Sequence, residues 1–165
     1  VGGNHDRWGE DFWGEDLDIA FHPLEARFTI GQRSVLAVHG DGLTEQRWSA
    51  EFMYHVTRNR LMIAIWKAMH PDLGFWFVDR MSRGLGYTTR HPEVLDAAAE
   101  KQRAWAEQKL AEEPSVGLVV MGHTHRPALT EPFEGRQYLN PGAWMEDRCY
   151  AVATENGATL AQFTP

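Results

Sequence analysis

The segment Val116-Gly117-Leu118-Val119-Val120-Met121 runs directly into Gly122-His123-Thr124-His125, and this junction is the most informative stretch for the fold. Its first six residues are all apolar, which is typical of a short strand buried on both faces of a sheet. A glycine and two histidines follow at once. Since ligand sites in open α/β sheets gather beyond the carboxyl ends of the strands, we expect a functional loop here.

Two further motifs follow the same plan. Gly3-Asn4-His5-Asp6 reads as the end of a strand that enters a loop, and His39-Gly40-Asp41 ends a strand predicted over 34–38. If the three motifs converge, they offer four imidazoles, one amide oxygen and two carboxylates. Imidazole binds Mn²⁺, Fe²⁺ and Zn²⁺, and the oxygen ligands harden such a site. We therefore expect one shared metal site.

The rest of the chain alternates between two kinds of pattern. Short apolar runs between Gly and Asn turns predict further strands over 27–30, 128–133, 137–140, 149–154 and 158–163. Residues 1–42 are expected to mix loop and strand. Residues 43–113 are predicted to be helical: one helix from about Thr44 to His70-Pro71, a second from Asp72 to Gly84 or Gly86, and a third opening at Pro92.

Composition sets the class of protein. The 165 residues are 43% hydrophobic and 24% charged, which fits one ordinary domain, over residues 1–165, with a packed core. The formal net charge of −7 argues against a general nucleic-acid binder, because such proteins carry a basic face. The single cysteine, Cys149, excludes an internal disulfide. No apolar run approaches the ~18 residues of a membrane span.

The first residues are unusual for the start of a fold. Val1 is not preceded by Met or a signal peptide, and Gly3-Asn4-His5-Asp6 follows no strand of its own. We therefore expect the chain to be a fragment whose upstream part is missing.

Each motif alone is weak evidence, because a lone histidine in a loop is usually only solvated. In this order, however, the three motifs resemble the metal motifs of calcineurin-like metallophosphoesterases, over essentially the whole chain. The resemblance implies an α/β (α+β) fold: a four-layer sandwich of two mixed β-sheets flanked by helices. It also implies two divalent metals, with Mn²⁺ favoured over Fe²⁺ or Zn²⁺, and hydrolysis of a phosphoester or pyrophosphate bond.

The resemblance also implies roles for individual residues. The second metal would be held by Asn4, His39 and His123, and the first by His125. His5 would bind no metal but stabilise the phosphoryl group or protonate the leaving oxygen, with Asp6 as its partner. Imidazole suits that task because it titrates near neutral pH.

Other parts of the family's machinery do not occur in these 165 residues. The family also uses an Asp-x-His pair and a Gly-Asp-x-x-Asp motif, and neither is present. The chain is therefore predicted to bind the first metal poorly and to hydrolyse little by itself. Arg126 is a candidate bidentate contact to phosphate, with a plain surface arginine as an equal alternative.

Residues 43–113 bear on the substrate. Their many aromatic side chains either pack on the sandwich or form a cap whose inner wall, including Trp66 and Phe77, holds acyl chains. Residues 57–90 carry six basic against two acidic residues, which would attract anionic lipid headgroups. The segments 70–74, 122–127 and 138–144 resemble the UDP-2,3-diacylglucosamine diphosphatase branch of the family.

That branch implies cleavage of a pyrophosphate in lipid A synthesis, releasing UMP and a lipid monophosphate. It also implies a Mn²⁺-dependent, cytoplasmic enzyme, peripheral at the inner membrane face, with a phosphorylated lipid as substrate. Two alternatives remain open. One is a general metal-dependent phosphodiesterase or phosphatase on a soluble phosphorylated compound, and the other is a non-catalytic scaffold with this fold.

Overall fold

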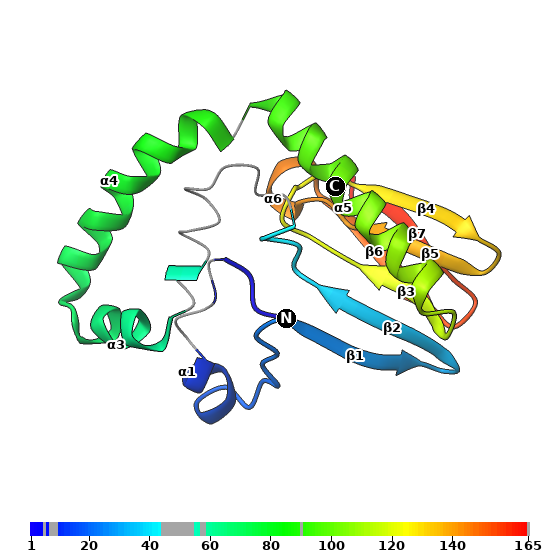
Figure 1. Cartoon of the computed structure of the whole chain (residues 1–165), viewed down its shortest axis with the longest axis horizontal. Coiled ribbons are helices and arrows are strands. Elements are labelled where there is room, and N and C mark those ends of the chain that lie inside the picture. Colours follow the sequence, from blue (N-terminus) through cyan, green and yellow to red (C-terminus); the bar gives the residue numbers. More distant parts are fainter. Residues whose placement is uncertain (5, 7–9, 44–54, 57–58, 90, 165) are drawn as a thin grey trace.

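The computed structural model describes residues 1–4, 6, 10–43, 55–56, 59–89 and 91–164 (Figure 1). A mixed sheet of five strands forms its centre, in the order β1-β2-β3-β5-β4. The inner strands β2, β3 and β5 are parallel, and the edge strands β1 and β4 run antiparallel to their neighbours. The bounds are β1 Glu25–Ile30, β2 Arg33–Val38, β3 Val116–Val120, β4 Ala128–Phe133 and β5 Arg136–Asn140.

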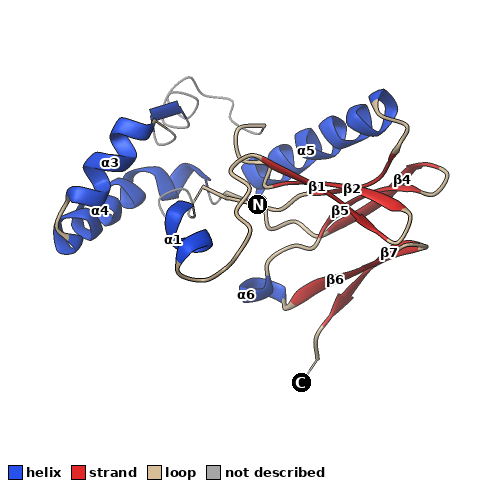
Figure 2. Cartoon of the chain, turned by 90° about the horizontal axis from the view of Figure 1, so that it is seen from below, coloured by secondary structure: helices blue, strands red, loops and turns tan. Residues whose placement is uncertain are grey.

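The sheet is buried on both faces, because successive side chains of its inner strands point to opposite sides. One set packs against helix α5 (Pro92–Glu112), in a core of Leu36, Ala106, Leu110, Val116, Val119, Met121 and Tyr138. The other set packs against a second, two-stranded sheet, in a core of Val35, Leu118, Leu139 and Ala158. Figure 2 shows α5 and this second sheet on opposite sides of the central sheet.

The second sheet is the antiparallel hairpin of β6 (Cys149–Thr154) and β7 (Gly157–Gln162). The predicted α/β class is confirmed, with one mixed sheet, a second sheet and flanking helices. The second sheet was also expected to be mixed, but its two described strands pair antiparallel. The specific metallophosphoesterase sandwich stays a prediction.

Arg33 ties the two sheets together from a buried position. Its guanidinium donates to the carbonyl oxygen of Gly117 at 2.9 Å, to Oε1 of Gln137 at 2.8 Å and to the carbonyl oxygen of Thr154 at 3.4 Å. Burial lowers the pKa of Arg33, yet a guanidinium stays charged in proteins. A planar group with several donors can therefore join β2, β3, β5 and β6 at one point.

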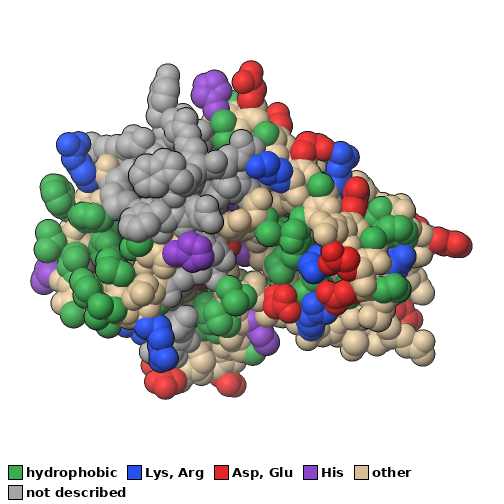
Figure 3. Space-filling view, in the orientation of Figure 1, with side chains coloured by type: hydrophobic (Ala, Val, Ile, Leu, Met, Phe, Trp, Pro, Cys, Tyr) green, Lys and Arg blue, Asp and Glu red, His purple; other side chains and the backbone are tan. Residues whose placement is uncertain are grey.

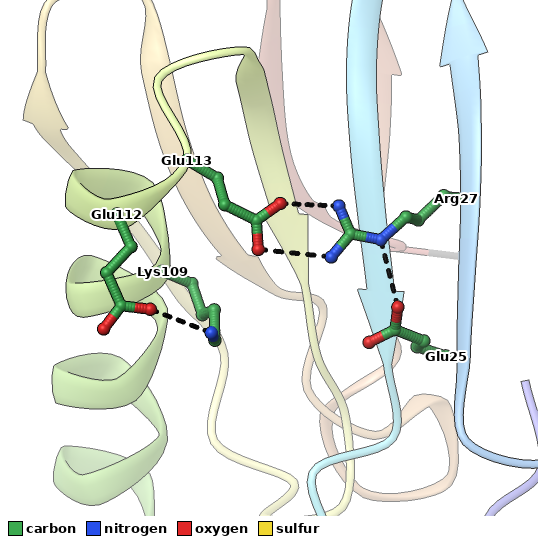
Figure 4. A network of polar contacts seen from close by, with 5 residues as sticks. All are labelled: Glu25, Arg27, Lys109, Glu112 and Glu113. Carbon is green, nitrogen blue, oxygen red and sulfur yellow. Dashed lines mark hydrogen bonds and ion pairs between the residues drawn. The ribbon is translucent and has the colours of Figure 1, made fainter.

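A second polar cluster joins the end of α5 to the edge strand β1 (Figure 4). The Arg27 guanidinium donates to both carboxylate oxygens of Glu113, at 2.6 and 3.2 Å, and to Glu25 at 3.0 Å. Beside it, Lys109 donates to Glu112 at 2.8 Å. The hydrogen bonds from Arg27 hold the pKa of Glu113 below its usual range.

Two helices between β2 and β3 lie apart from the sheet. Helix α3 (Arg60–Ala68) and helix α4 (Pro71–Thr89) form an arc, and α5 then returns along the sheet (Figure 1). We call α3 and α4 the helical arm. The predicted start of helix at Thr44 falls outside the described residues.

The predicted continuous helix up to residue 70 is wrong. Asn59 is extended and caps α3, since its Oδ1 accepts hydrogen bonds from the backbone N–H groups of Leu61 and Met62. The stop before Pro71 is confirmed, because α3 ends at Ala68.

The predicted end of α4 at Gly84 or Gly86 is also wrong, as the helix continues to Thr89. A glycine inside a helix costs only about 1 kcal/mol, so two of them do not end it. The stronger signal is Pro92, which holds His91 in an extended conformation and opens α5.

Two short helices were not expected from the sequence. Helix α1 (Glu10–Glu15) lies in the segment predicted as loop and strand, and α6 (Trp144–Asp147) precedes β6. None of the described helices is both long and apolar enough to cross a membrane.

Candidate metal centre

The site forms at the carboxyl ends of two neighbouring parallel strands. His39 directly follows β2, and His123 follows the end of β3. The backbone N–H of Gly122 donates to the carbonyl oxygen of His39 at 3.1 Å, which fixes the two loops side by side. The rings of His39 and His123 meet edge to face, with centroids 5.2 Å apart. The structure thus brings together two of the predicted ligands.

Asn4 joins this pair from a third segment. Its Oδ1 lies 3.1 Å from Nε2 of His39. The preceding residue must be glycine, because a Cβ on Gly3 would lie 2.7 Å from Cε1 of the His39 ring. The N–H of Gly2 donates to the carbonyl oxygen of His22 at 2.8 Å and anchors the segment. Asn4, His39 and His123 therefore form one cluster, which we call the histidine–amide cluster.

The predicted catalytic pair is covered only in part, since His5 lies outside the described residues. Asp6 closes the turn: its Oδ2 accepts a hydrogen bond from the N–H of Gly3 at 3.0 Å. The indole N–H of Trp13 donates to the carbonyl oxygen of Asp6 at 3.3 Å. Asp6 thus shapes the loop that carries Asn4, and its expected partnership with His5 stays a prediction.

His125 follows a different arrangement from the other predicted ligands. Its Nδ1 lies 2.7 Å from Oε1 of Glu146 on α6, and its side chain is half exposed. Within the described part of the chain, His125 takes no part in the Asn4–His39 and His39–His123 contacts that define the histidine–amide cluster. Nothing in the sequence pointed to Glu146, because an acidic pair between Met145 and Arg148 has no ligand spacing of its own.

The donor set of the cluster suits a divalent transition metal. Two imidazoles and one amide oxygen match the preferences of Mn²⁺, Fe²⁺ and Zn²⁺. Within the described residues, no group of three or more His, Cys, Asp and Glu side chains is arranged to hold a metal ion. Asn4 is not of these residue types, and its amide oxygen would be the third donor alongside His39 and His123.

Three buried polar residues support the loop after β3. Two of them lie in segments that the sequence analysis singled out, but no role was predicted for any of the three. Gln102 of α5, Thr124 of the loop and Asn140 at the end of β5 are each at most 1% exposed. Gln102 Nε2 donates to the carbonyl oxygen of Gly122 at 3.1 Å, and Thr124 Oγ1 donates to Gln102 Oε1 at 3.1 Å. One signal was present in the sequence: Gln102 occupies the same helix face as Ala98, Ala106 and Leu110.

Backbone conformation at this loop is unusual. His123 has φ of 69° and His125 has φ of 58°, which is the left-handed region that glycine and asparagine favour. Thr124 lies between them and donates its backbone N–H to the carbonyl oxygen of Gly122 at 2.8 Å. Residues held in this region cost about 1–3 kcal/mol each and cluster at functional sites.

The predicted phosphate contact Arg126 is engaged within the protein. Its Nε donates to Oδ1 of Asp96 on α5 at 2.7 Å. The two residues border a cavity of about 480 Å³ between α5 and β4, whose wall also includes Leu129, Thr130 and Tyr138. This contact leaves both alternatives for Arg126 open.

The predicted substrate residues Trp66 and Phe77 meet each other in the helical arm. Their rings pack edge to face with centroids 5.2 Å apart. Figure 3 shows hydrophobic side chains gathered over α3 and α4, and the largely exposed ones are Leu61, Ile65, Leu73, Phe75, Trp76, Phe77 and Val78. The contact between Trp66 and Phe77 joins α3 to α4 and is not a contact with the histidine–amide cluster.

Comparison with known proteins adds no family assignment. No known family model matches this chain, and no curated protein sequence matches it. The interpretation of the site therefore depends on its motifs and on the geometry of Asn4, His39 and His123.

Proposed function

We propose that this chain carries the second-metal site of a hydrolase that cleaves a phosphoester or pyrophosphate bond with two divalent metals. The observation that supports this most is the meeting of Asn4, His39 and His123, which belong to three separate segments. Mn²⁺ is the favoured metal, with Fe²⁺ or Zn²⁺ as alternatives. His125 would serve the first metal.

Each group of the site has a task in this proposal. Two divalent metals, when bound, supply the positive charge that polarises a phosphoryl group. Asn4, His39 and His123 hold one of them through an amide oxygen and two neutral ring nitrogens. His5 carries the proton for the leaving oxygen, and Asp6, whose Oδ2 accepts a hydrogen bond from the N–H of Gly3, is its proposed partner.

For the substrate we propose a diacylated UDP-sugar, as in the UDP-2,3-diacylglucosamine diphosphatase branch. Support comes from the helical arm, where Phe75 is 79% and Trp76 60% exposed instead of packed on the sheet. Exposed apolar area of this kind marks a binding surface for an apolar partner. Arg60, Lys67 and Arg80 are exposed on the same helices and would attract phosphate or anionic headgroups at the inner membrane face.

The metal proposal is tested by titrating the chain with Mn²⁺ in a calorimeter. We expect one Mn²⁺ per chain, and at least tenfold weaker binding in His39→Ala and in His123→Ala, because each loses a ring nitrogen ligand. His70→Ala is the matched control, since His70 is an exposed histidine of the helical arm. Equal binding in His39→Ala and His70→Ala would contradict the proposal.

The substrate proposal has its own test. Binding of UDP-2,3-diacylglucosamine and of its deacylated analogue is compared in detergent by calorimetry. Replacing both Trp66 and Phe77 by Ser should weaken binding of the acylated compound at least tenfold and leave the deacylated one unchanged. An equal loss for both compounds would mean that the two rings only hold α3 against α4.

A further inference from the structure

We propose that Gln102, Thr124 and Asn140 are positioning residues that set the geometry of the His39–His123 pair. We call the three side chains the amide network. The inference deepens the proposed function and rests on it where metal binding is concerned. The positioning of the two rings is a separate claim, which the geometry of the network supports without a metal.

The amide network is buried and fully hydrogen-bonded. Asn140 Nδ2 donates to the carbonyl oxygen of Gly122 and to Thr124 Oγ1, both at 3.1 Å, and lies 3.3 Å from Gln102 Oε1. Asn140 Oδ1 accepts from the N–H of Gly142 at 3.0 Å. With the bonds from Gln102 and Thr124, every polar side-chain atom of the three residues has a partner. Networks satisfied in this way are rigid, because each lost bond leaves a buried polar group unpaired.

The network converges on Gly122, whose backbone also bonds to the loop of His39. The carbonyl oxygen of Gly122 accepts hydrogen bonds from Gln102 on α5 and from Asn140 on β5. The N–H of Gly122 donates to the backbone carbonyl oxygen of His39. Gly122 is therefore held by side chains from α5 and β5 and by the backbone after β2. Since His123 is the next residue, any shift of Gly122 moves the ring of His123 relative to that of His39.

The network also opposes the strain of the loop. His123 and His125 are both left-handed, a conformation that is strained for residues other than glycine. Thr124 lies between them, and its buried hydroxyl makes two hydrogen bonds. A loop with two such residues relaxes unless its middle residue is fixed. The hydroxyl of Thr124 supplies that fixed point, which is why we assign a positioning role to it.

The loop of His39 is in contact with the same network. Gly40 has φ of 96°, and a Cβ there would overlap Nε2 of Gln102. Gln102 thus touches Gly40 directly and Gly122 through a hydrogen bond. One side chain of α5 sets the spacing between the loops that carry His39 and His123.

The chain offers an internal control for the threonine hydroxyl. Thr130 Oγ1 is buried and, among the described side chains, has no hydrogen-bond partner. Thr124→Val and Thr130→Val each replace the threonine hydroxyl by a methyl group and keep the shape of the side chain. We expect fully folded Thr124→Val to bind Mn²⁺ at least tenfold more weakly than the wild type. Thr130→Val should leave the Mn²⁺ affinity unchanged. Thr124→Ser keeps the hydroxyl and should stay within about threefold of the wild type.

A second pair of variants covers the case in which Thr124→Val does not fold. Gln102→Asn keeps the amide but withdraws it by one methylene, out of reach of Gly122. Gln108→Asn makes the same change at a residue whose amide donates to exposed Glu112 on the same helix. The readouts are Mn²⁺ affinity and, without metal, the NMR cross-relaxation between the rings of His39 and His123. We expect Gln102→Asn to lower both and Gln108→Asn to lower neither.

The two proposals fail differently. If the wild type binds no Mn²⁺, the proposed function is wrong, and the ring-to-ring NMR signal alone decides the positioning claim. If Gln102→Asn leaves that signal and the Mn²⁺ affinity at wild-type values, the positioning claim is wrong even when the site binds metal. Failure of Thr124→Ser to rescue the Mn²⁺ affinity lost in Thr124→Val would also overturn it.

Discussion

Replacing Gly40 by alanine tests the link between the His39 loop and α5. The new methyl group would be strained at φ of 96°, would overlap Gln102 Nε2 and would lie 3.2 Å from Met121 Cε. Gln102 is fully buried, so it cannot swing into solvent to make room. The methyl group must therefore either break the hydrogen bond from Gln102 to Gly122 or push the His39 loop away from α5.

The cost can be worked out from these contacts. Left-handed strain contributes roughly 1–2 kcal/mol. A buried hydrogen bond lost with its partner left unpaired contributes about 1–3 kcal/mol. The expected fall in the free energy of unfolding is about 2–5 kcal/mol, a large share of the 5–15 kcal/mol typical of a domain. Urea unfolding at 25 °C, followed by circular dichroism, measures it directly.

Two other glycines separate the two contributions. Gly135 has φ of 70° with nothing within 4 Å of a built Cβ, so Gly135→Ala should show the strain alone. Gly14 in α1 has neither a positive φ nor a close neighbour, and Gly14→Ala should stabilise by up to about 1 kcal/mol. If Gly40→Ala costs no more than Gly135→Ala, the close packing of Gln102 against the His39 loop is refuted.

Two further predictions concern the polar ties of the fold. Arg33→Lys should lower the free energy of unfolding, measured in urea, by about 1–3 kcal/mol, because an ammonium group cannot reach Gly117, Gln137 and Thr154 at once. An unchanged unfolding midpoint would mean that the guanidinium adds nothing to the stability. The pKa of Glu113 is lowered by Arg27, so the stability from this pair is complete above pH 4.5, the ordinary value, and is lost as the pH falls through the lowered pKa. The Tm of Glu113→Gln should therefore lie below that of the wild type at neutral pH and meet it in acid, and a gap that is independent of pH would contradict the reasoning.

The sheet was predictable because its signals are local. Strands 128–133 and 149–154 match their predicted bounds, and the other strands differ by one or two residues at one or both ends. Each is a short apolar or alternating run between turn residues, so neighbouring side chains decide its conformation. The meeting of His39 and His123 was predictable for another reason: each follows a strand, and ligand sites gather beyond the carboxyl ends of the strands in open α/β sheets.

The support of the site was not predictable, because it depends on contacts between distant residues. Gln102 in a helix with many charged residues looks like a surface residue, and only the apolar stripe around it indicates burial. The start of α3 and the end of α4 differ from the prediction for a different reason. The start depends on the cap that Asn59 provides, and the end depends on Pro92 and not on the glycines within α4.

The left-handed backbone at His123 and His125 has a consequence for directed evolution of this protein. A library randomised at these two codons and screened only for yield should enrich Gly and Asn, which adopt that conformation at lower cost than other residues. A library screened for metal capture should retain histidine at position 123 despite the lower yield. The divergence between the two enriched pools would measure how far selection for expression and selection for binding conflict at one short loop.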